Sequence, residues 1–216
     1  MANQTKRVLL APHNREGLLS LPVGEAKGLV LFAHGSGSSR LSPRNAMVSA
    51  VLWHAGLATL LFDLLTEAEA EDRANVFDIP LLAQRLGDAA QWARDTPSLG
   101  QLPLGVFGAS TGAAAALLAA SRRSDIRAVV SRGGRPDLAG AALAKVAAPT
   151  LLIVGGDDVV VLDFNREALN LMHCERRLEI VPGATHLFEE DGALESVAYL
   201  ARHWFLRHLS GIAEVG

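Results

Sequence analysis

Residues 104–112 read Leu-Gly-Val-Phe-Gly-Ala-Ser-Thr-Gly, and they decide the fold class of this chain. The apolar run Leu104–Phe107 is typical of a buried strand, and Thr111–Arg122 has the composition and length of a helix. Between them, the Gly-x-Ser-x-Gly pattern of Gly108–Gly112 permits a very sharp strand-to-helix turn. Ser110 then stands exposed at the tip in strained geometry. We interpret Ser110 as a nucleophile; the alternative is a tight turn with an idle serine.

The same order of elements recurs along the chain. Five short runs are apolar almost throughout, as strands are when helices cover both faces of their sheet. Helical segments separate them, and such connections join parallel strands. The pattern predicts an α/β fold with a doubly wound, mostly parallel sheet of about seven or eight strands, with Arg7–Leu10 and Gly17–Leu21 as an antiparallel pair at its edge. The predicted strands are Leu29–Ala33, Leu57–Phe62, Leu104–Phe107, Ile126–Val130, Thr150–Val154 and Arg177–Val181, and the predicted helices are Pro43–His54, Asp78–Arg94, Thr111–Arg122, Leu138–Val146, Asp163–Met172 and Gly192–Leu209.

The bulk composition fits a single domain without a nucleic-acid or membrane partner. Half of the 216 residues are apolar, which is enough to bury one core, so we expect one domain over residues 1–216. The formal net charge of −3 and the scattered arginines offer no basic surface to a phosphate backbone. No segment reaches the roughly 20 apolar residues of a membrane span, and the apolar run within residues 1–10 is too short for a signal peptide. We expect a cytoplasmic monomer or homodimer.

Cys174 is the only cysteine. An internal disulfide is therefore impossible, and a cysteine-based zinc site would lack its other ligands. No metal site is expected.

A serine nucleophile needs a base within hydrogen-bond reach. Ligands bind beyond the carboxyl ends of the strands in such a sheet, so the base is sought there. Among seven histidines, we favour His186, because it lies in the loop after the predicted strand Arg177–Val181. An ordinary loop histidine is the alternative.

A carboxylate is needed to fix the imidazole tautomer, and it is expected after the strand Thr150–Val154. Asp157 and Asp158 both lie there. We favour Asp158, because the Gly-x-x-Asp spacing from Gly155 gives the loop room to turn back, and we keep Asp157 as the alternative.

Two backbone N–H groups are expected to form an oxyanion hole. One belongs to Thr111, next to the nucleophile at the positive end of its helix. The other belongs to the glycine-rich loop after Leu29–Ala33, most naturally to Ser36, with Gly37 next.

The same glycine-rich loop raises a rival, dinucleotide-binding interpretation. Gly35 and Gly37 follow a strand and precede a helix, but Arg40 stands where the third glycine is needed, and no Gly-Lys-Ser/Thr follows for a P-loop. We therefore reject a nucleotide cofactor.

Arg132 and Arg135 follow a predicted strand at the same edge of the sheet. Either guanidinium suits an anionic substrate group, because it binds carboxylates in a bidentate fork. Alternatively, either arginine pairs with Asp137 or Asp63 and holds the loop. Asp63 itself is expected to support the site from behind or to anchor a loop.

Four segments together, residues 34–37, 108–112, 155–158 and 183–186, resemble the α/β-hydrolase superfamily, and the short layout is similar to its dienelactone-hydrolase-like branch. The resemblance implies a central sheet of about eight strands and ester or related acyl-transfer chemistry without a cofactor. Dienelactone hydrolases proper use a cysteine where Ser110 stands, so their substrate is not carried over.

The resemblance also bears on the shape of the pocket. No long insertion separates Val130 from Thr150, where many relatives place a cap domain, so we expect no large cap and a shallow, open pocket. The expected function is a serine hydrolase for small esters or lactones. The alternative is a non-catalytic protein of the same fold that binds a ligand or a partner.

Overall fold

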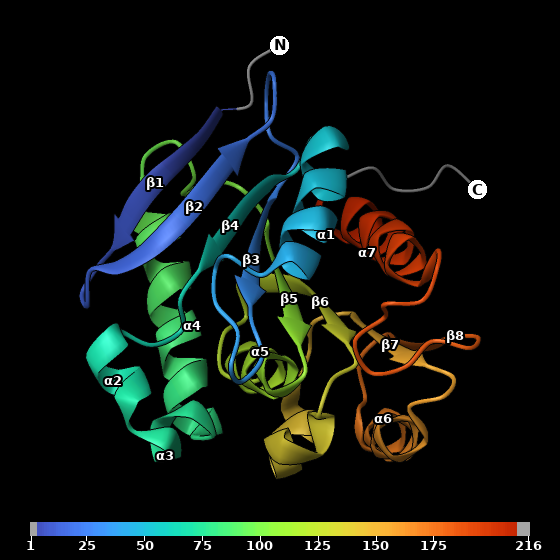
Figure 1. Ribbon diagram of the computed structural model, residues 1–216. Helices are drawn as coiled ribbons and strands as arrows, with labels where there is room; N and C mark the ends of the chain where they lie inside the picture. The colour runs from blue at the N-terminus through green and yellow to red at the C-terminus, as the bar shows by residue number, and fades with distance from the viewer. Residues whose placement is uncertain (1–3, 211–216) are drawn as a thin grey trace.

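A computed structural model describes residues 4–210 (Figure 1). These residues form one eight-stranded sheet in the order β1-β2-β4-β3-β5-β6-β7-β8. β2 is antiparallel to β1 and β4, and every pair from β4 to β8 is parallel. The predicted α/β sheet is confirmed, whereas the predicted domain over residues 1–216 extends at both ends beyond the described residues. The strands are β1 (Gln4–Leu10), β2 (Arg15–Leu21), β3 (Leu29–Ala33), β4 (Ala58–Phe62), β5 (Leu104–Ala109), β6 (Ile126–Arg132), β7 (Thr150–Gly155) and β8 (Arg176–Val181).

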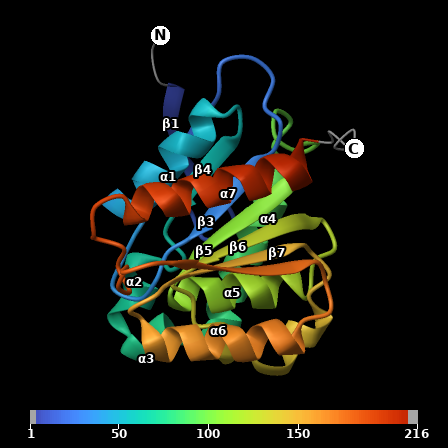
Figure 2. The same cartoon turned by 90° about the vertical axis from the view of Figure 1, so that its right-hand side faces the viewer.

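Helices cover both faces of the sheet (Figure 2). α1 and α7 pack on one face, and α4, α5 and α6 pack on the other. Neither face of the inner strands is free for water, which is why these strands are apolar throughout rather than alternating. The helices are α1 (Pro43–His54), α2 (Glu67–Glu71), α3 (Arg73–Val76), α4 (Ile79–Asp95), α5 (Thr111–Ala120), α6 (Val159–Leu171) and α7 (Ala193–Leu209), with the 3-10 helix η1 (Pro136–Lys145).

Two hydrophobic cores lie on either side of the sheet, and neighbouring strand residues alternate between them. In β3, Leu31 packs in the core with α4 and α5, and Phe32 packs in the core with α1 and α7. The alanine-rich α5 is buried on almost every side, with Ala113–Ala116 fully inaccessible. Small side chains let this helix lie directly against the sheet, which fixes the position of its N-terminus.

The structure corrects two of the predicted helices and adds two short ones. α6 begins at Val159 rather than Asp163, directly after Asp158. The helix predicted over Leu138–Val146 is a 3-10 helix broken at Gly140, whose φ of 53° is not helical. The polar stretch after β4, for which no helix or strand is predicted above, forms the two short helices α2 and α3.

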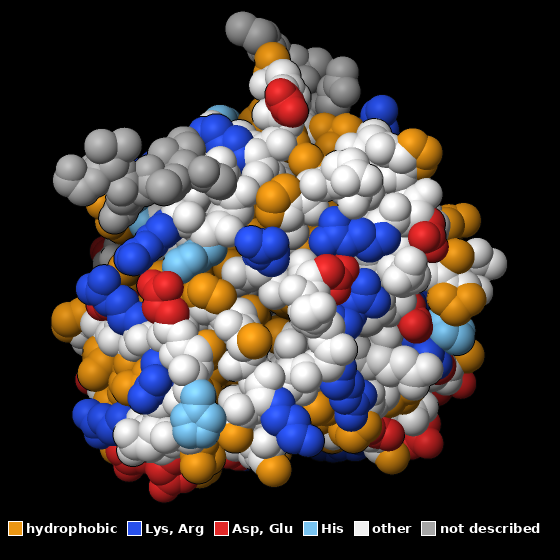
Figure 3. Space-filling model, turned by 180° about the vertical axis from the view of Figure 1, so that it is seen from behind, with side chains coloured by type: hydrophobic (Ala, Val, Ile, Leu, Met, Phe, Trp, Pro, Cys, Tyr) orange, Lys and Arg blue, Asp and Glu red, His pale blue; other side chains and the backbone are white. Residues whose placement is uncertain are grey.

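Charged side chains are dispersed over the surface. On the face seen in Figure 3, lysine and arginine side chains are spread among acidic and apolar ones. Within residues 4–210, no helix combines the length and apolar character that a bilayer crossing needs. The absence of a nucleic-acid partner and the cytoplasmic location stay predictions.

Candidate active site

The turn between β5 and α5 holds Ser110 in a strained conformation. Its φ of 52° and ψ of −121° lie in a region that side chains rarely adopt, at a typical cost of about 1–3 kcal/mol. A Cβ on Gly108 would lie 2.5 Å from the Cα of Ala113, and a Cβ on Gly112 would overlap the carbonyl oxygen of Ala33. Both glycines are therefore required by close backbone approach, and the turn leaves Ser110 at the end of the strand.

The imidazole of His186 joins Ser110 to Asp158. Its Nδ1 lies 2.7 Å from Oδ2 of Asp158, and its Nε2 lies 3.4 Å from Oγ of Ser110. An ionised carboxylate only accepts hydrogen bonds, so Nδ1 carries the proton and Nε2 is free to accept the proton of the Ser110 hydroxyl. The 3.4 Å distance is long for a hydrogen bond, as is common before a substrate binds.

The loop after β7 distinguishes the two candidate acids. Asp158 lies at the N-terminus of α6 with its carboxylate against His186, whereas Asp157 donates its backbone N–H to the carbonyl oxygen of Ala184 at 3.0 Å. A Cβ on Gly155 would overlap that same carbonyl, so the glycine lets the two loops touch. The structure brings Asp158, and not Asp157, to the imidazole.

The two expected oxyanion donors lie close together, and one of them already has a partner. The backbone N–H of Ser36 donates to Oγ1 of Thr111 at 2.9 Å, which ties the β3–α1 loop to the start of α5. A Cβ on the neighbouring Gly35 would lie 3.0 Å from Cβ and 3.7 Å from Oγ of Ser110. The loop therefore touches the nucleophile, but the Ser36 N–H must leave or share the Thr111 hydroxyl before it can hold an oxyanion.

His34 is a structural partner of this loop that the sequence analysis missed. Its Nε2 accepts the backbone N–H of Leu64 at 3.1 Å, so Nδ1 carries the proton and donates to the carbonyl of Gly35 at 3.0 Å. Burial lowers the pKa of His34, although the Gly35 carbonyl and the charge of Asp63 oppose this shift. The neutral ring thus joins the β3–α1 loop to the segment after β4.

Asp63 anchors the same loop. Its carboxylate accepts the backbone N–H of Arg40 at 2.7 Å and also pairs with the Arg40 guanidinium. The same guanidinium also pairs with the carboxylate of Glu16 in the β1–β2 hairpin. Of the two roles expected for Asp63, the contacts favour loop anchoring.

Arg135 is fully engaged within its own loop. It donates through Nε and Nη2 to the two carboxylate oxygens of Asp137, at 2.9 and 2.7 Å, and lies 4.7 Å from the ring centroid of Phe164. The hydrogen bonds to Asp137 and the charge of that carboxylate raise the pKa of Arg135, although burial opposes this shift. They favour the loop-holding interpretation for this residue.

Arg132 is different, because no acidic side chain within residues 4–210 pairs with it. Its side chain lies on the α1 and α7 face near Arg44, with the guanidinium 5.8 Å from the centroid of Phe188, two residues after His186. The residue is only 7% exposed, and its buried Nε and Nη1 have no hydrogen-bond partner. Burial, together with the charge of Arg44, lowers its pKa to about 10.

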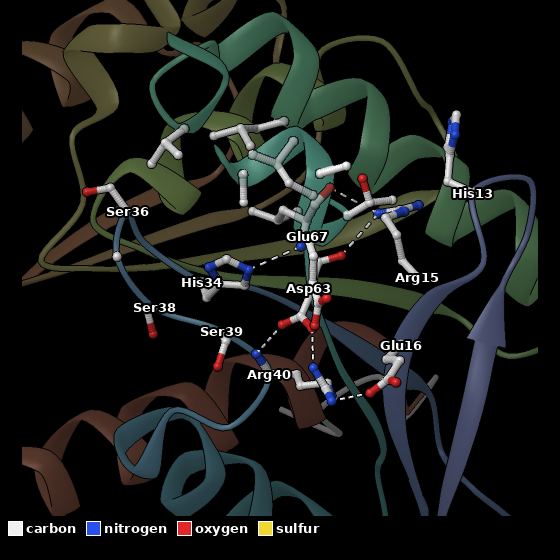
Figure 4. Close-up of a pocket in the computed structure, with 18 of the residues that line it drawn as sticks. His13, Arg15, Glu16, His34, Ser36, Ser38, Ser39, Arg40, Asp63 and Glu67 are labelled. Atoms are coloured by element: carbon white, nitrogen blue, oxygen red, sulfur yellow. Dashed lines mark hydrogen bonds and ion pairs between the residues drawn. The ribbon is translucent and has the colours of Figure 1, made fainter. Parts of the chain in front are cut away.

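A pocket of about 870 Å³ opens beside the β3–α1 loop (Figure 4). It is more extensive than the shallow depression expected from the short connection between β6 and β7, because α2 and α3 supply a wall of their own. The pocket stays partly open to solvent. Its lining comes from the β1–β2 turn (residues 13–16), the β3–α1 loop (residues 34–40), the segment after β4 (residues 63–71), Val76 and Leu82.

The sheet, the strained turn at Ser110 and the contact of His186 with both Ser110 and Asp158 define an α/β hydrolase. The chain belongs to the dienelactone hydrolase family, whose sequence model matches residues 19–212. The predicted resemblance is therefore confirmed.

Solved structures agree with this assignment. The crystal structure of a dienelactone hydrolase from Anabaena variabilis is 52% identical, with a TM-score of 0.91 over 96% of this chain and 98% of that one. An α/β serine hydrolase without a lid from Xanthomonas campestris, 19% identical, has a TM-score of 0.77 over 99% of each chain and shows the shared fold alone.

Two curated relatives have a different name. They are Mycobacterium tuberculosis proteins from the strains CDC 1551 and H37Rv, each named "Putative phosphoribosyl transferase". Each is 56% identical over 212 residues, which is 98% of this chain but 48% of the relative. This chain thus spans about half the length of these relatives.

Proposed function

We propose that this chain is a serine hydrolase that cleaves small esters or lactones, with Ser110 as nucleophile, His186 as base and Asp158 as the acid that orients the base. The observation that carries the proposal is the position of His186, whose two ring nitrogens face Asp158 at 2.7 Å and Ser110 at 3.4 Å.

In the first half of the reaction, the Ser110 oxygen attacks the ester carbonyl carbon while Nε2 of His186 takes the hydroxyl proton. The carbonyl oxygen becomes negative and accepts hydrogen bonds from the N–H groups of Thr111 and Ser36. Asp158 stabilises the imidazolium without taking its proton. His186 then gives the proton to the leaving alcohol as the carbon–oxygen bond breaks, which leaves an acyl-enzyme at Ser110.

In the second half, water takes the place of the alcohol. His186 accepts a proton from this water, whose oxygen attacks the acyl carbonyl, and then returns the proton to Oγ of Ser110 as the ester to the enzyme breaks. The products are the free acid and the original serine.

Arg132, rather than Arg135, is the candidate for an anionic group on the substrate. It lies beneath the loop that carries His186 and has no acidic partner, whereas Arg135 is occupied by Asp137. Arg132 lies near His186, and His186 must reach the leaving oxygen. The anionic group is therefore expected on the alcohol part of the substrate. Arg132→Met is expected to slow carboxyphenyl acetate relative to phenyl acetate, and Arg135→Met is not; equal ratios in both variants would reject this role.

We attribute the transferase name of the curated relatives to the half of their sequence that this chain does not match. Residues 19–212 already match a hydrolase family, and they contain the six parallel strands β3 to β8 of the described sheet. Transfer of a phosphoribosyl group by the present chain alone would overturn this division.

The proposal is tested by a screen of neutral esters and lactones with purified protein. Hydrolysis that disappears in Ser110→Ala, with unfolding temperature preserved, supports the enzyme. A folded protein that hydrolyses none of them, yet retains ligands from the screen, supports the alternative of a non-catalytic binding protein.

A further inference from the structure

The pocket in Figure 4 lies next to the nucleophile, although Ser110 itself is not part of its lining. Gly35 and Ser36 line it, and the close approach of Gly35 to Ser110 places the reacting carbonyl at its edge. A pocket of about 870 Å³ lies in the size range of small-molecule sites. Part of a substrate bound to Ser110 can therefore extend into it.

The direction of proton transfer decides which part of the substrate enters. His186 must lie next to the leaving oxygen to protonate it, so the alcohol occupies the His186 side of Ser110. Within the described chain, neither the loop of His186 nor that of Asp158 contributes to the pocket lining. The pocket is therefore on the acyl side.

The wall nearest Ser36 is apolar. In Figure 4, aliphatic side chains crowd the part of the pocket beside Ser36, and the polar side chains gather around Asp63. Leu64 and Leu65 are buried at its base, and the exposed Ala68 and Ala70 on α2 leave space above them. The aliphatic lining residues are Leu64, Leu65, Ala68, Ala70, Val76 and Leu82.

Two of the polar side chains that line the pocket, those of His34 and Arg40, already have partners. Both nitrogens of His34 have backbone partners, and Arg40 pairs with Asp63 and Glu16. Arg15 is 2% exposed and donates to two carbonyl groups at 3.4 Å, and its buried Nε and Nη2 have no hydrogen-bond partner among the described residues. In Figure 4, Arg15 lies beyond Asp63 as seen from Ser36, so its open donors are remote from an acyl chain that lies beside Ser36.

Charge also excludes one kind of acyl group. Four carboxylates line the pocket against two guanidinium groups, so a carboxylate at the end of the acyl chain would be repelled. The lining carboxylates are Glu16, Asp63, Glu67 and Glu71, and the guanidinium groups are Arg15 and Arg40.

From these observations we infer that the pocket binds the acyl part of the substrate and selects an apolar, uncharged acyl chain longer than acetyl. The inference rests on the proposed serine hydrolase function and names its substrate class. Each methylene that enters the pocket is expected to raise kcat/KM about two- to fourfold until the apolar wall is covered.

The test uses p-nitrophenyl esters that share one leaving group and differ only in the acyl part: acetate, butyrate, octanoate and the hemiester of glutaric acid. The expected order of kcat/KM is octanoate above butyrate above acetate, with the charged hemiester about tenfold or more below butyrate. A flat profile, or a preference for the hemiester, would overturn the inference.

A matched pair of variants locates the effect. Ala70→Trp fills the pocket from an exposed helix position, whereas Ala74→Trp lies on the exposed surface of α3 outside the pocket. Ala70→Trp is expected to lower kcat/KM for octanoate about tenfold or more and to leave acetate unchanged; Ala74→Trp changes neither. Equal losses in both variants would contradict the location.

A binding measurement separates this inference from the proposed chemistry. Calorimetry on Ser110→Ala with octanamide and acetamide needs no turnover. Tighter binding of octanamide that is lost in Ser110→Ala/Ala70→Trp supports the pocket even if no ester is hydrolysed. Equal affinity for the two amides contradicts the pocket even if acetate esters are good substrates.

Discussion

At the scale of single residues, the proposed function depends on how the imidazole of His186 is held. Asp158 faces Nδ1 of His186 at 2.7 Å, and this contact alone leaves Nε2 free to accept a proton from Ser110. Asp157 lies one position away but uses its backbone to hold the loop. Neighbouring carboxylates thus have different roles, set by the direction in which each side chain leaves the turn.

Replacing each acid in turn separates these roles. Asp158→Asn is expected to lower kcat about a thousandfold or more, because an amide can donate to Nδ1 and stabilise the wrong tautomer. Asp157→Asn keeps the backbone contact to Ala184 and is expected to change kcat less than about threefold. Steady-state kinetics on one neutral ester measure both, and a larger loss in Asp157→Asn would contradict the assignment.

Protonation of His34 is expected to make the free energy of unfolding depend on pH. Its pKa is lowered in the folded protein, chiefly by burial, so the unfolded chain binds the proton more readily. The free energy of unfolding is therefore expected to be constant above the unfolded value of about 6.5 and to fall as the pH drops below it. Urea unfolding between pH 5 and 8 measures this slope, and His34→Gln should reduce it. An identical slope in the variant would show that other groups cause it.

At the scale of elements, the junction between β5 and α5 is the most constrained part of the chain. Gly112 lies where the first turn of α5 meets the carboxyl end of β3, and no side chain fits there. The buried alanines of α5 pack directly against the sheet, so the helix cannot move away from it. Strain at Ser110 therefore persists, because packing on both sides enforces it.

Gly112→Ala tests this constraint. The added methyl meets the backbone of β3, so the variant is expected to lose about 2–4 kcal/mol in the free energy of unfolding and to lose activity. Gly87→Ala in α4 is the matched control, since its Cβ meets nothing within 4 Å and alanine favours a helix by about 0.5–1 kcal/mol. Urea denaturation compares the two, and similar stabilities would refute the close approach.

The boundaries of the strands and helices show how much of the fold the sequence alone predicts. The apolar runs predicted the inner strands well, since burial on both faces leaves a clear pattern. α6 was predicted to start at Asp163 but starts at Val159. The β-branched Val159–Val161 are weak helix formers, whereas packing of Val161 and Leu162 in a small core against Val154 of β7 favours the earlier start.

Contacts between distant segments had no local signal. The bond from Ser36 to Thr111 spans 75 positions, and that from Leu64 to His34 spans 30. The residue types and the ends of the predicted strands were enough to suggest Ser110 and His186. The hydrogen bonds that hold the β3–α1 loop could be found only from the structure.

At the scale of the whole molecule, parallel strands bring the candidate residues to one edge. His186 is 76 positions from Ser110 and 28 from Asp158, and the three meet because β5, β7 and β8 all end on the same side of the sheet. In the proposed reaction, the alcohol part of the substrate lies at the His186 loop, and the acyl part enters the pocket beside the β3–α1 loop. This arrangement occupies a chain about half as long as the curated relatives.

The most direct measurement is labelling with a fluorophosphonate, followed by intact mass and peptide mapping. A single adduct on Ser110 is predicted, absent in Ser110→Ala and much slower in His186→Gln, because the hydroxyl reacts only when the imidazole takes its proton. A folded protein that forms no adduct, or an adduct elsewhere that survives in Ser110→Ala, would contradict the account.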